Sequence, residues 1–189
     1  EYLWIVDPVD GTTNFVHGFP FFSVSIALAY RGEVIVGVIY DPIRDELFVA
    51  EKGKGPYVHG DRMKVSTEAG LSDSLVAIGF PPDPEFALPA NMSVAKALAP
   101  KVRNLRAGGS AALHLAYVAA GRLSAYTEIG LNPWDIAAGA LLVQESGGTV
   151  TDTQGNPYHL AVRYVAASNG QIHEELIRTL TEENATGVN

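Results

Sequence analysis

Two aspartates near the start of the chain are spaced for joint chemistry. Asp7 and Asp10 lie in the stretch IVDPVDGTTNF, residues 5–15. Pro8 cannot donate an N–H and holds the residue before it in an extended conformation, so we expect strand pairing to stop there. Gly11 permits a backbone conformation that other residues reach only with strain. The two carboxylates can then converge on one point, and carboxylate oxygens are ligands that hard cations such as Mg²⁺ prefer.

The residues after Gly11 add the features of an anion site. Thr12, Thr13 and Asn14 are favoured helix N-cap types, and a short helix starting there would direct free N–H groups toward the carboxylates. The alternative is a purely structural turn, because Asp-Pro and Asp-Gly are common turn dipeptides whose side chains bond nearby backbone. The stretch therefore predicts either a cation site beside an anion site or a well-built turn.

A second acidic feature occurs far along the chain, in NPWDIAAGALLVQESGG, residues 132–148. Pro133 suits a helix start and Asp135 would lie in the first turn, where a carboxylate is stabilising by about 0.3–1 kcal/mol. That structural role explains why an acid stands at position 135, but nothing more of this stretch. It does not explain the Trp134-Asp135 pair or the small residues that follow, which allow close packing against a neighbour.

The elements that must position these acids change in type along the chain. The first part predicts adjacent antiparallel strands over residues 2–6, 22–30, 33–40, 46–50 and 55–59. The later part predicts strands over 75–79, 102–105, 123–128 and 162–167, alternating with helices over 89–98, 110–121, 133–146 and 171–180 and with a Pro-rich loop at 81–84. We interpret residues 1–68 as an antiparallel-sheet half and residues 69–189 as an α/β half.

Composition excludes several classes of protein. The 189 residues are 47% hydrophobic and 18% charged, and no apolar run approaches the roughly 20 residues of a membrane span. The net charge of −8 and the scattered 13 Lys and Arg residues argue against nucleic acid as a partner. The absence of cysteine fits a cytoplasmic location. The five histidines show no metal-ligand spacing, so we assign them to surface or packing roles.

The stretches WIVDPVDGTTNF and GLNPWDIAAGALLVQESGG resemble the two signature motifs of the inositol monophosphatase family, and RAGGSAALHLAYVAAGRL between them is also similar. Members of that family are Mg²⁺-dependent, lithium-sensitive phosphatases and are commonly homodimers. The resemblance covers essentially the whole chain. It implies a layered α-β-α-β-α fold of the α+β or α/β type, with an antiparallel sheet first and a mixed sheet second.

The resemblance also assigns roles to individual residues. The family's metal-binding positions correspond to Asp7, Val9 (through its carbonyl), Asp10 and Asp135. The phosphate-cradling turn corresponds to Gly11 and Thr12, whose hydroxyl would orient the attacking water. Catalysis would then rest on Asp7, Asp10, Thr12 and Asp135.

Substrate contacts are implied on the same basis. They would come from Asp10, Gly11, Thr12, Gly109, Ala111, Glu128 and Asp135. Glu128 matches an acid that bonds substrate hydroxyls in the inositol-specific enzymes, although a solvated acid at a strand end is an equally good reading. Gly109 and Ala111 match backbone positions near the sugar ring.

Electrostatics supports a metal-assisted reaction. Each carboxylate would repel a phosphate dianion by about 4 kcal/mol per unit-charge pair 4 Å apart at an effective dielectric of 20, so binding requires cations. We expect hydrolysis of a phosphate monoester by a metal-activated water, with inositol 1-phosphate as substrate.

Two alternatives remain open. The same fold could act on histidinol phosphate, fructose 1,6-bisphosphate or a 3'-phosphoadenosine nucleotide, although Thr13 stands where the nucleotide phosphatases more usually carry Lys. The second alternative is a non-catalytic domain used for oligomerisation or partner binding. The family pattern places two helices and a metal-binding Glu before the first motif, whereas this sequence begins at Glu1. Either these residues are part of a longer protein or the domain lacks its N-terminal helical segment. We expect the 189 residues alone to bind metal weakly and turn over poorly, whereas the complete protein would be active.

Overall fold

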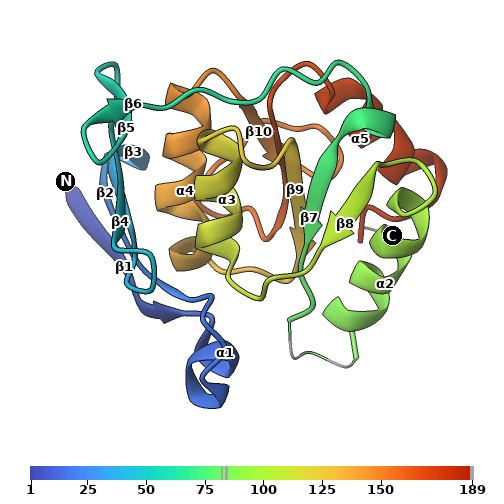
Figure 1. Ribbon diagram of the computed structural model, residues 1–189, viewed down its shortest axis with the longest axis horizontal. Coiled ribbons are helices and arrows are strands. Elements are labelled where there is room, and N and C mark those ends of the chain that lie inside the picture. The colour runs from blue at the N-terminus through green and yellow to red at the C-terminus, as the bar shows by residue number, and fades with distance from the viewer. Residues whose placement is uncertain (82, 84, 188–189) are drawn as a thin grey trace.

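The computed structural model describes residues 1–81, 83 and 85–187. Two β-sheets enclose a layer of helices, and further helices cover the far side of the second sheet (Figure 1). Pro82 and Pro84 of the Pro-rich loop lie outside the described residues. Within the described part of the chain, no helix is long and apolar enough to cross a membrane.

The first sheet is antiparallel and its six strands follow sequence order. They are β1 (Tyr2–Asp10), β2 (Ser23–Tyr30), β3 (Glu33–Asp41), β4 (Glu46–Glu51), β5 (Gly55–Val58) and β6 (Asp61–Arg62). Burial alternates along β2, because one face packs on the helix layer. The other face carries exposed apolar side chains such as Trp4 and Val6, and no helix among the described residues covers it (Figure 1).

The second sheet has the order β10-β11-β9-β7-β8. Its strands are β7 (Leu75–Ile78), β8 (Asn104–Arg106), β9 (Ala125–Ile129), β10 (Thr149–Asp152) and β11 (Tyr164–Ser168). Strand β7 pairs in parallel with β8 and β9, whereas β11 is antiparallel to both of its neighbours. The sheet is therefore mixed, as the family resemblance implies.

Helices α3 (Ala111–Ala119) and α4 (Pro133–Glu145) lie between the sheets, while α2 (Ala87–Leu98) and α5 (His173–Glu182) pack outside the second one (Figure 1). A short α1 (Thr12–His17) follows β1, and a 3₁₀ turn spans Leu71–Asp73. The small residues of α4 allow close contact with the first sheet: a Cβ added at Gly37 of β3 would lie 2.7 Å from the Ala138 carbonyl oxygen. This close packing brings the start of α4 near the end of β1.

Several elements differ from the sequence expectation; among them, the two-residue strand β6 and the 3₁₀ turn at Leu71–Asp73 were not predicted. Strand β1 runs to Asp10 instead of ending at Pro8, because pairing with β2 resumes at Asp10 and Ser23 after a register shift. The proline interrupts the ladder without ending it. Strand β10 was not expected, since four residues, TVTD, carry too little periodicity to predict a strand.

Candidate active site

Asp7, Asp10 and Asp135 come together where β1 ends and α4 begins, and one ligand oxygen from each lies within 4.8 Å of the others. In a regular strand, residues three apart point to opposite faces of the sheet. The irregularity between Asp7 and Asp10 corrects this, because a bulge of one residue changes the face of everything after it. The one extra residue between Asp7 and Asp10 therefore places both carboxylates on the same face of the sheet, where they can converge.

Protein hydrogen bonds fix two of these acids. Asp10 Oδ2 accepts from the Ser110 hydroxyl and from the Ala112 N–H at 2.9 Å, in the first turn of α3. Asp135 Oδ2 accepts the Asn132 N–H at 2.7 Å as part of a capping box at the start of α4. Two helix starts thus hold two aspartates in place. Ser110 is the N-cap of α3, and its bond to Asp10 joins segments far apart in sequence, so it was not predicted.

The acids carry an uncompensated charge. Burial raises the pKa of Asp10 to about 7, and the neighbouring Asp135 and Asp7 charges add to the effect. Burial likewise raises the pKa of Asp135 to about 6 and that of Glu128 to about 7. None of the ion pairs found among the described residues involves any of these acids. An oxygen-only donor set that lacks a protein cation fits a hard divalent ion.

A cavity of about 590 Å³ connects the acids to the residues expected to contact substrate. Its lining includes Asp10, Gly11, Thr12, Gly109, Ala111, Glu128 and Asp135. An adjoining hollow of about 460 Å³ is lined by Asp7 and Val9 together with Asp10 and Asp135. The structure therefore brings all nine candidate residues to the same region.

Glu128 faces this cavity from β9 and depends on two residues that sequence reasoning missed. The buried Tyr126 hydroxyl donates to Glu128 Oε2, which is possible because residues two apart on a strand share a face. Because Gly79 has no side chain, there is space for the Glu128 carboxylate, which a Cβ at this position would overlap. The strand spacing could have suggested Tyr126, whereas the Gly79 contact joins distant segments.

The turn before α1 differs from the sequence expectation. Gly11, with φ of +91°, is the N-cap residue, in place of the Thr and Asn side chains that were expected to cap the helix. No side chain caps this first turn among the described residues. Asn14 instead donates to the carbonyls of Phe21 at 2.6 Å and Gly108 at 2.7 Å. The sequence identified the turn but not its attachment to the Gly108 loop.

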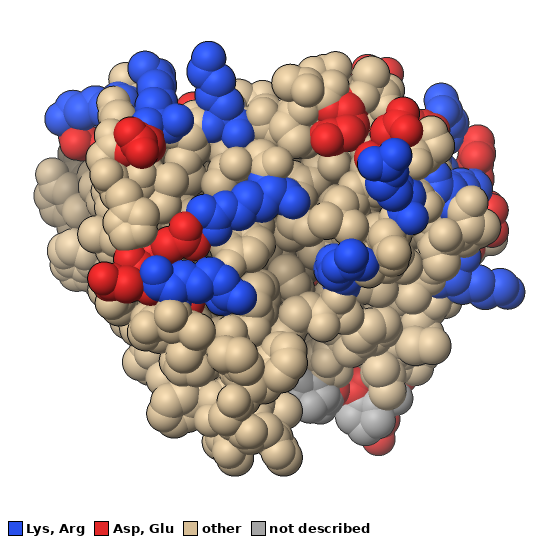
Figure 2. All heavy atoms as spheres, in the orientation of Figure 1, with Lys and Arg blue, Asp and Glu red and all other residues tan. Residues whose placement is uncertain are grey.

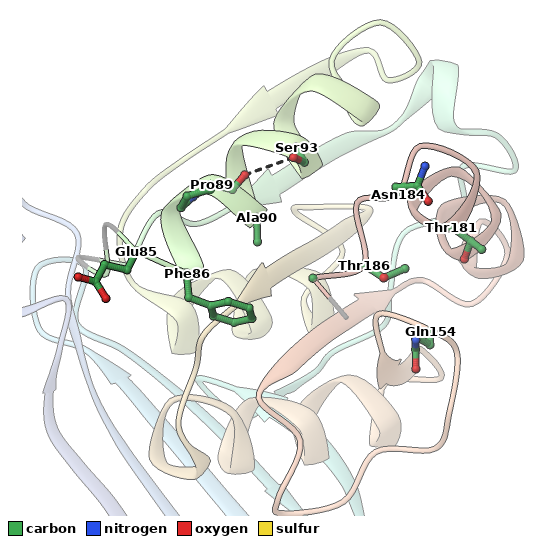
Figure 3. Close-up of a pocket in the computed structure, with 10 residues that line it drawn as sticks. Glu85, Phe86, Pro89, Ala90, Ser93, Gln154, Thr181, Asn184 and Thr186 are labelled. Carbon is green, nitrogen blue, oxygen red and sulfur yellow. Dashed lines mark hydrogen bonds between the residues drawn. The ribbon is translucent and has the colours of Figure 1, made fainter. Parts of the chain in front are cut away.

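The larger hollow of the molecule, about 670 Å³, lies elsewhere, between α2, α5 and the turn after β10 (Figure 3). Its lining includes Phe86, Ser93, Gln154 and Thr181, with Glu85 as the one acid among the lining residues. Figure 3 shows these side chains spread around the hollow without a convergent group of carboxylates. Chemistry rather than volume therefore assigns function to the smaller cavity.

Comparisons with known proteins agree with this geometry. A family model described as the inositol monophosphatase family matches residues 1–185. Inositol monophosphatase 2 of Solanum lycopersicum is 47% identical over 184 residues, which cover 96% of this chain and 69% of that protein. Nus factor SuhB of Pseudomonas aeruginosa is 43% identical over 182 residues, covering 95% and 67% of the two chains.

Solved structures show the same relationship. The inositol monophosphatase of Anabaena (Nostoc) superposes with a TM-score of 0.90 at 42% identity, covering 96% of this chain and 72% of that one. The chain belongs to the inositol monophosphatase family, a family of phosphatases that generally use Mg²⁺.

Proposed function

We propose that this protein hydrolyses a phosphate monoester with the help of Mg²⁺, and that inositol 1-phosphate is its substrate. One observation carries the proposal: three aspartates without a protein cation converge at the edge of a cavity that also contains Thr12 and Glu128. Hydrogen bonds to Asp10 and Asp135 do not neutralise the group, and bringing buried acids together without a cation destabilises the folded protein.

The carboxylates of Asp7, Asp10 and Asp135, with the Val9 carbonyl, would hold the metal. A bound Mg²⁺ would neutralise these acids, attract the phosphate and make an attacking water more acidic. The bonds from Ser110 and Ala112 to Asp10 keep one carboxylate oriented before the ion arrives. Preorganisation of this kind limits the reorganisation needed during reaction.

The Gly11–Asn14 turn would hold the phosphate. N–H groups of a first helical turn lack acceptors within the helix and can donate to phosphate oxygens. Thr12 lines both hollows of the site, so its hydroxyl can orient a water between the aspartates and the phosphate.

Glu128 would bind the alcohol part of the substrate. It lines the cavity with Gly109 and Ala111, and it can accept hydrogen bonds from hydroxyl groups. A polyol with adjacent hydroxyls suits one buried carboxylate better than an adenine ring does. This favours inositol 1-phosphate over histidinol phosphate or a 3'-phosphoadenosine nucleotide, while fructose 1,6-bisphosphate remains the strongest competitor.

The name Nus factor SuhB, which several relatives carry, points to a different role for those proteins. In Figure 2 the Lys and Arg side chains lie over the upper and middle parts of the viewed face, interspersed with acidic ones, and do not form one continuous patch. The net charge of −8 also opposes a phosphate backbone. We therefore favour a small phosphate ester as the partner.

Phosphate release tests the proposal. The protein is given inositol 1-phosphate, fructose 1,6-bisphosphate, histidinol phosphate and a 3'-phosphoadenosine nucleotide, each with and without Mg²⁺ and lithium. We expect Mg²⁺-dependent, lithium-inhibited release that is fastest with inositol 1-phosphate. Faster release from another ester would show that this ester, and not inositol 1-phosphate, is the substrate. Release from none of them would support a non-catalytic domain.

A further inference from the structure

The turn at residues 107–109 is held from two sides by side chains that the proposed reaction does not use. From α1, Asn14 Nδ2 donates to the Gly108 carbonyl at 2.7 Å. From α3, His114 Nε2 accepts the Gly108 N–H at 3.0 Å. The backbone N–H and the backbone C=O of Gly108, in a turn that lines the cavity, are therefore bonded by side chains from two different helices.

The fit around this turn is tight. A Cβ at Gly108 would lie 2.5 Å from Phe21 Cε1 and 2.7 Å from His114 Nε2, and one at Gly109 would lie 2.9 Å from Asn14 Nδ2. Gly109 also has a φ of +85°, which other residues rarely adopt. A side chain at either glycine would therefore displace Asn14, His114 or Phe21.

His114 is present at a cost. It is 2% exposed, and burial lowers its pKa to about 4, so the ring is neutral. Since Nε2 accepts a hydrogen bond, the proton lies on Nδ1, which has no partner among the described residues. A buried N–H without an acceptor is destabilising, and leucine would avoid that cost. Histidine supplies an acceptor for the Gly108 N–H, which leucine could not supply.

The same ring reaches toward the other end of the cavity. The His114 centroid lies 5.0 Å from that of Tyr126, whose hydroxyl donates to Glu128. Asn14 belongs to the helix that would hold phosphate. Contacts therefore run continuously from the phosphate-binding turn, through the Gly108 peptide, to the carboxylate expected at the alcohol end.

We propose that Asn14 and His114 are positioning residues that fix the turn at residues 107–109 and thereby hold the phosphate and alcohol ends of the site in register. The inference rests on the proposed function. Its consequence is that removing either side chain impairs substrate binding and turnover while leaving the aspartates able to bind metal. Among the described residues, the bonds to Asp10 and Asp135 come from Ser110, Ala112 and Asn132, outside the turn.

The test compares wild type with His114→Leu, His114→Gln, Asn14→Ala and the Asn14→Ala/His114→Leu double variant. Leucine keeps the volume but lacks the acceptor, whereas the Gln amide oxygen can replace Nε2. We expect each of the Leu and Ala changes to lower kcat/KM about tenfold through both KM and kcat. His114→Gln should recover most of the loss, and the double variant should lose less than the product of the single losses. Mg²⁺ affinity should stay within about twofold.

His173 provides the matched control. It is also a buried histidine, bonded to Ser168 Oγ and Thr151 Oγ1 at 2.9 Å, but it does not line the cavity. His173→Leu should reduce stability and leave kcat/KM unchanged. An equal loss of kcat/KM in this variant, or no advantage of His114→Gln over His114→Leu, would overturn the positioning role.

Amide hydrogen exchange separates this inference from the proposed function. Protection of the Gly108 amide should fall in His114→Leu and in Asn14→Ala, whether or not any ester is hydrolysed. Unchanged protection in both variants would refute the positioning role. If both variants lose protection of the Gly108 amide but the wild-type protein releases no phosphate, the proposed function alone would be refuted.

Discussion

Two groups of acids in the molecule have opposite surroundings. Asp41 is fully buried, yet its Oδ2 pairs with Arg44 at 2.9 Å and its Oδ1 accepts two backbone N–H groups. Glu46 forms a two-point pair with Arg122, which holds the pKa of Glu46 below its usual value. Asp10 is similarly buried, but it faces other carboxylates and its pKa rises to about 7.

The difference separates structure from function. A buried acid that has its own arginine is already compensated and serves the fold. A group of buried acids without a cation is stable only when protonated or when a cation arrives from solution, and perturbed acids of this kind are typical of active sites. The predictions below test whether this distinction holds, beginning with the largest expected effect.

Asp10→Asn should abolish most phosphate release, by about 10²–10³-fold, because it removes a metal ligand and a preorganised charge. The same change should stabilise the metal-free protein, since one of the mutually repelling acids is gone. Steady-state phosphate release and denaturant unfolding in EDTA measure the two effects. A less stable Asp10→Asn protein in EDTA would contradict the distinction between the two groups.

The metal-free protein should lose stability as pH rises. An acid whose folded pKa is raised binds more protons when folded, so its stabilisation is complete below about pH 4 and is lost as pH rises through the folded values of about 6–7. For Asp10, the loss of unfolding free energy between pH 5 and pH 8 is on the order of 3 kcal/mol. Unfolding at pH 5 and pH 8 in EDTA measures it, and Asp10→Asn or saturating Mg²⁺ should reduce the difference. A pH dependence identical in Asp10→Asn would show that another group is responsible.

Asp41→Asn should have the reverse profile. It removes the charge partner of Arg44 and weakens two backbone bonds, so we expect a loss of about 2 kcal/mol in unfolding free energy. Mg²⁺-dependent turnover at 25 °C should be unchanged, because Asp41 does not line the acidic cavity. A large loss of turnover in a folded variant would place Asp41 within the functional group.

Gly79→Ala should produce the smallest effect. The new Cβ would overlap the Glu128 carboxylate and force it to move, so KM should rise about tenfold while Mg²⁺ affinity is preserved. Gly32→Ala serves as a control, because a Cβ there meets nothing within 4 Å, although its positive φ costs some stability. An unchanged KM in Gly79→Ala would argue against Glu128 as a substrate contact.

The sequence predicts much of the fold and names candidate residues that the structure brings together, but it does not predict how they are held. The spacing of Asp7 and Asp10 around a proline points to two carboxylates that converge at the end of a strand, and Asp135 after Pro133 points to a helix start. These signals are local. The bulge that carries the strand on to Asp10 was not predicted. The Gly79–Glu128 contact and the His114–Gly108 bond depend on how segments far apart in sequence pack, and no local pattern specifies them. His114, like the other histidines, was assigned to a surface or packing role, and its hydrogen bond to the Gly108 N–H is visible only in the structure.

Calorimetric titration of Mg²⁺ into the protein at pH 7 tests the central claim most directly. Repeating it in buffers of different ionisation enthalpy gives the number of protons released. With the pKa of Asp10 at about 7, we predict binding that releases about half a proton from Asp10 and that is lost in Asp10→Asn but kept in Asp41→Asn. Equal Mg²⁺ binding by wild type and Asp10→Asn, or none by wild type, would contradict the assignment of the uncompensated aspartates as the metal site.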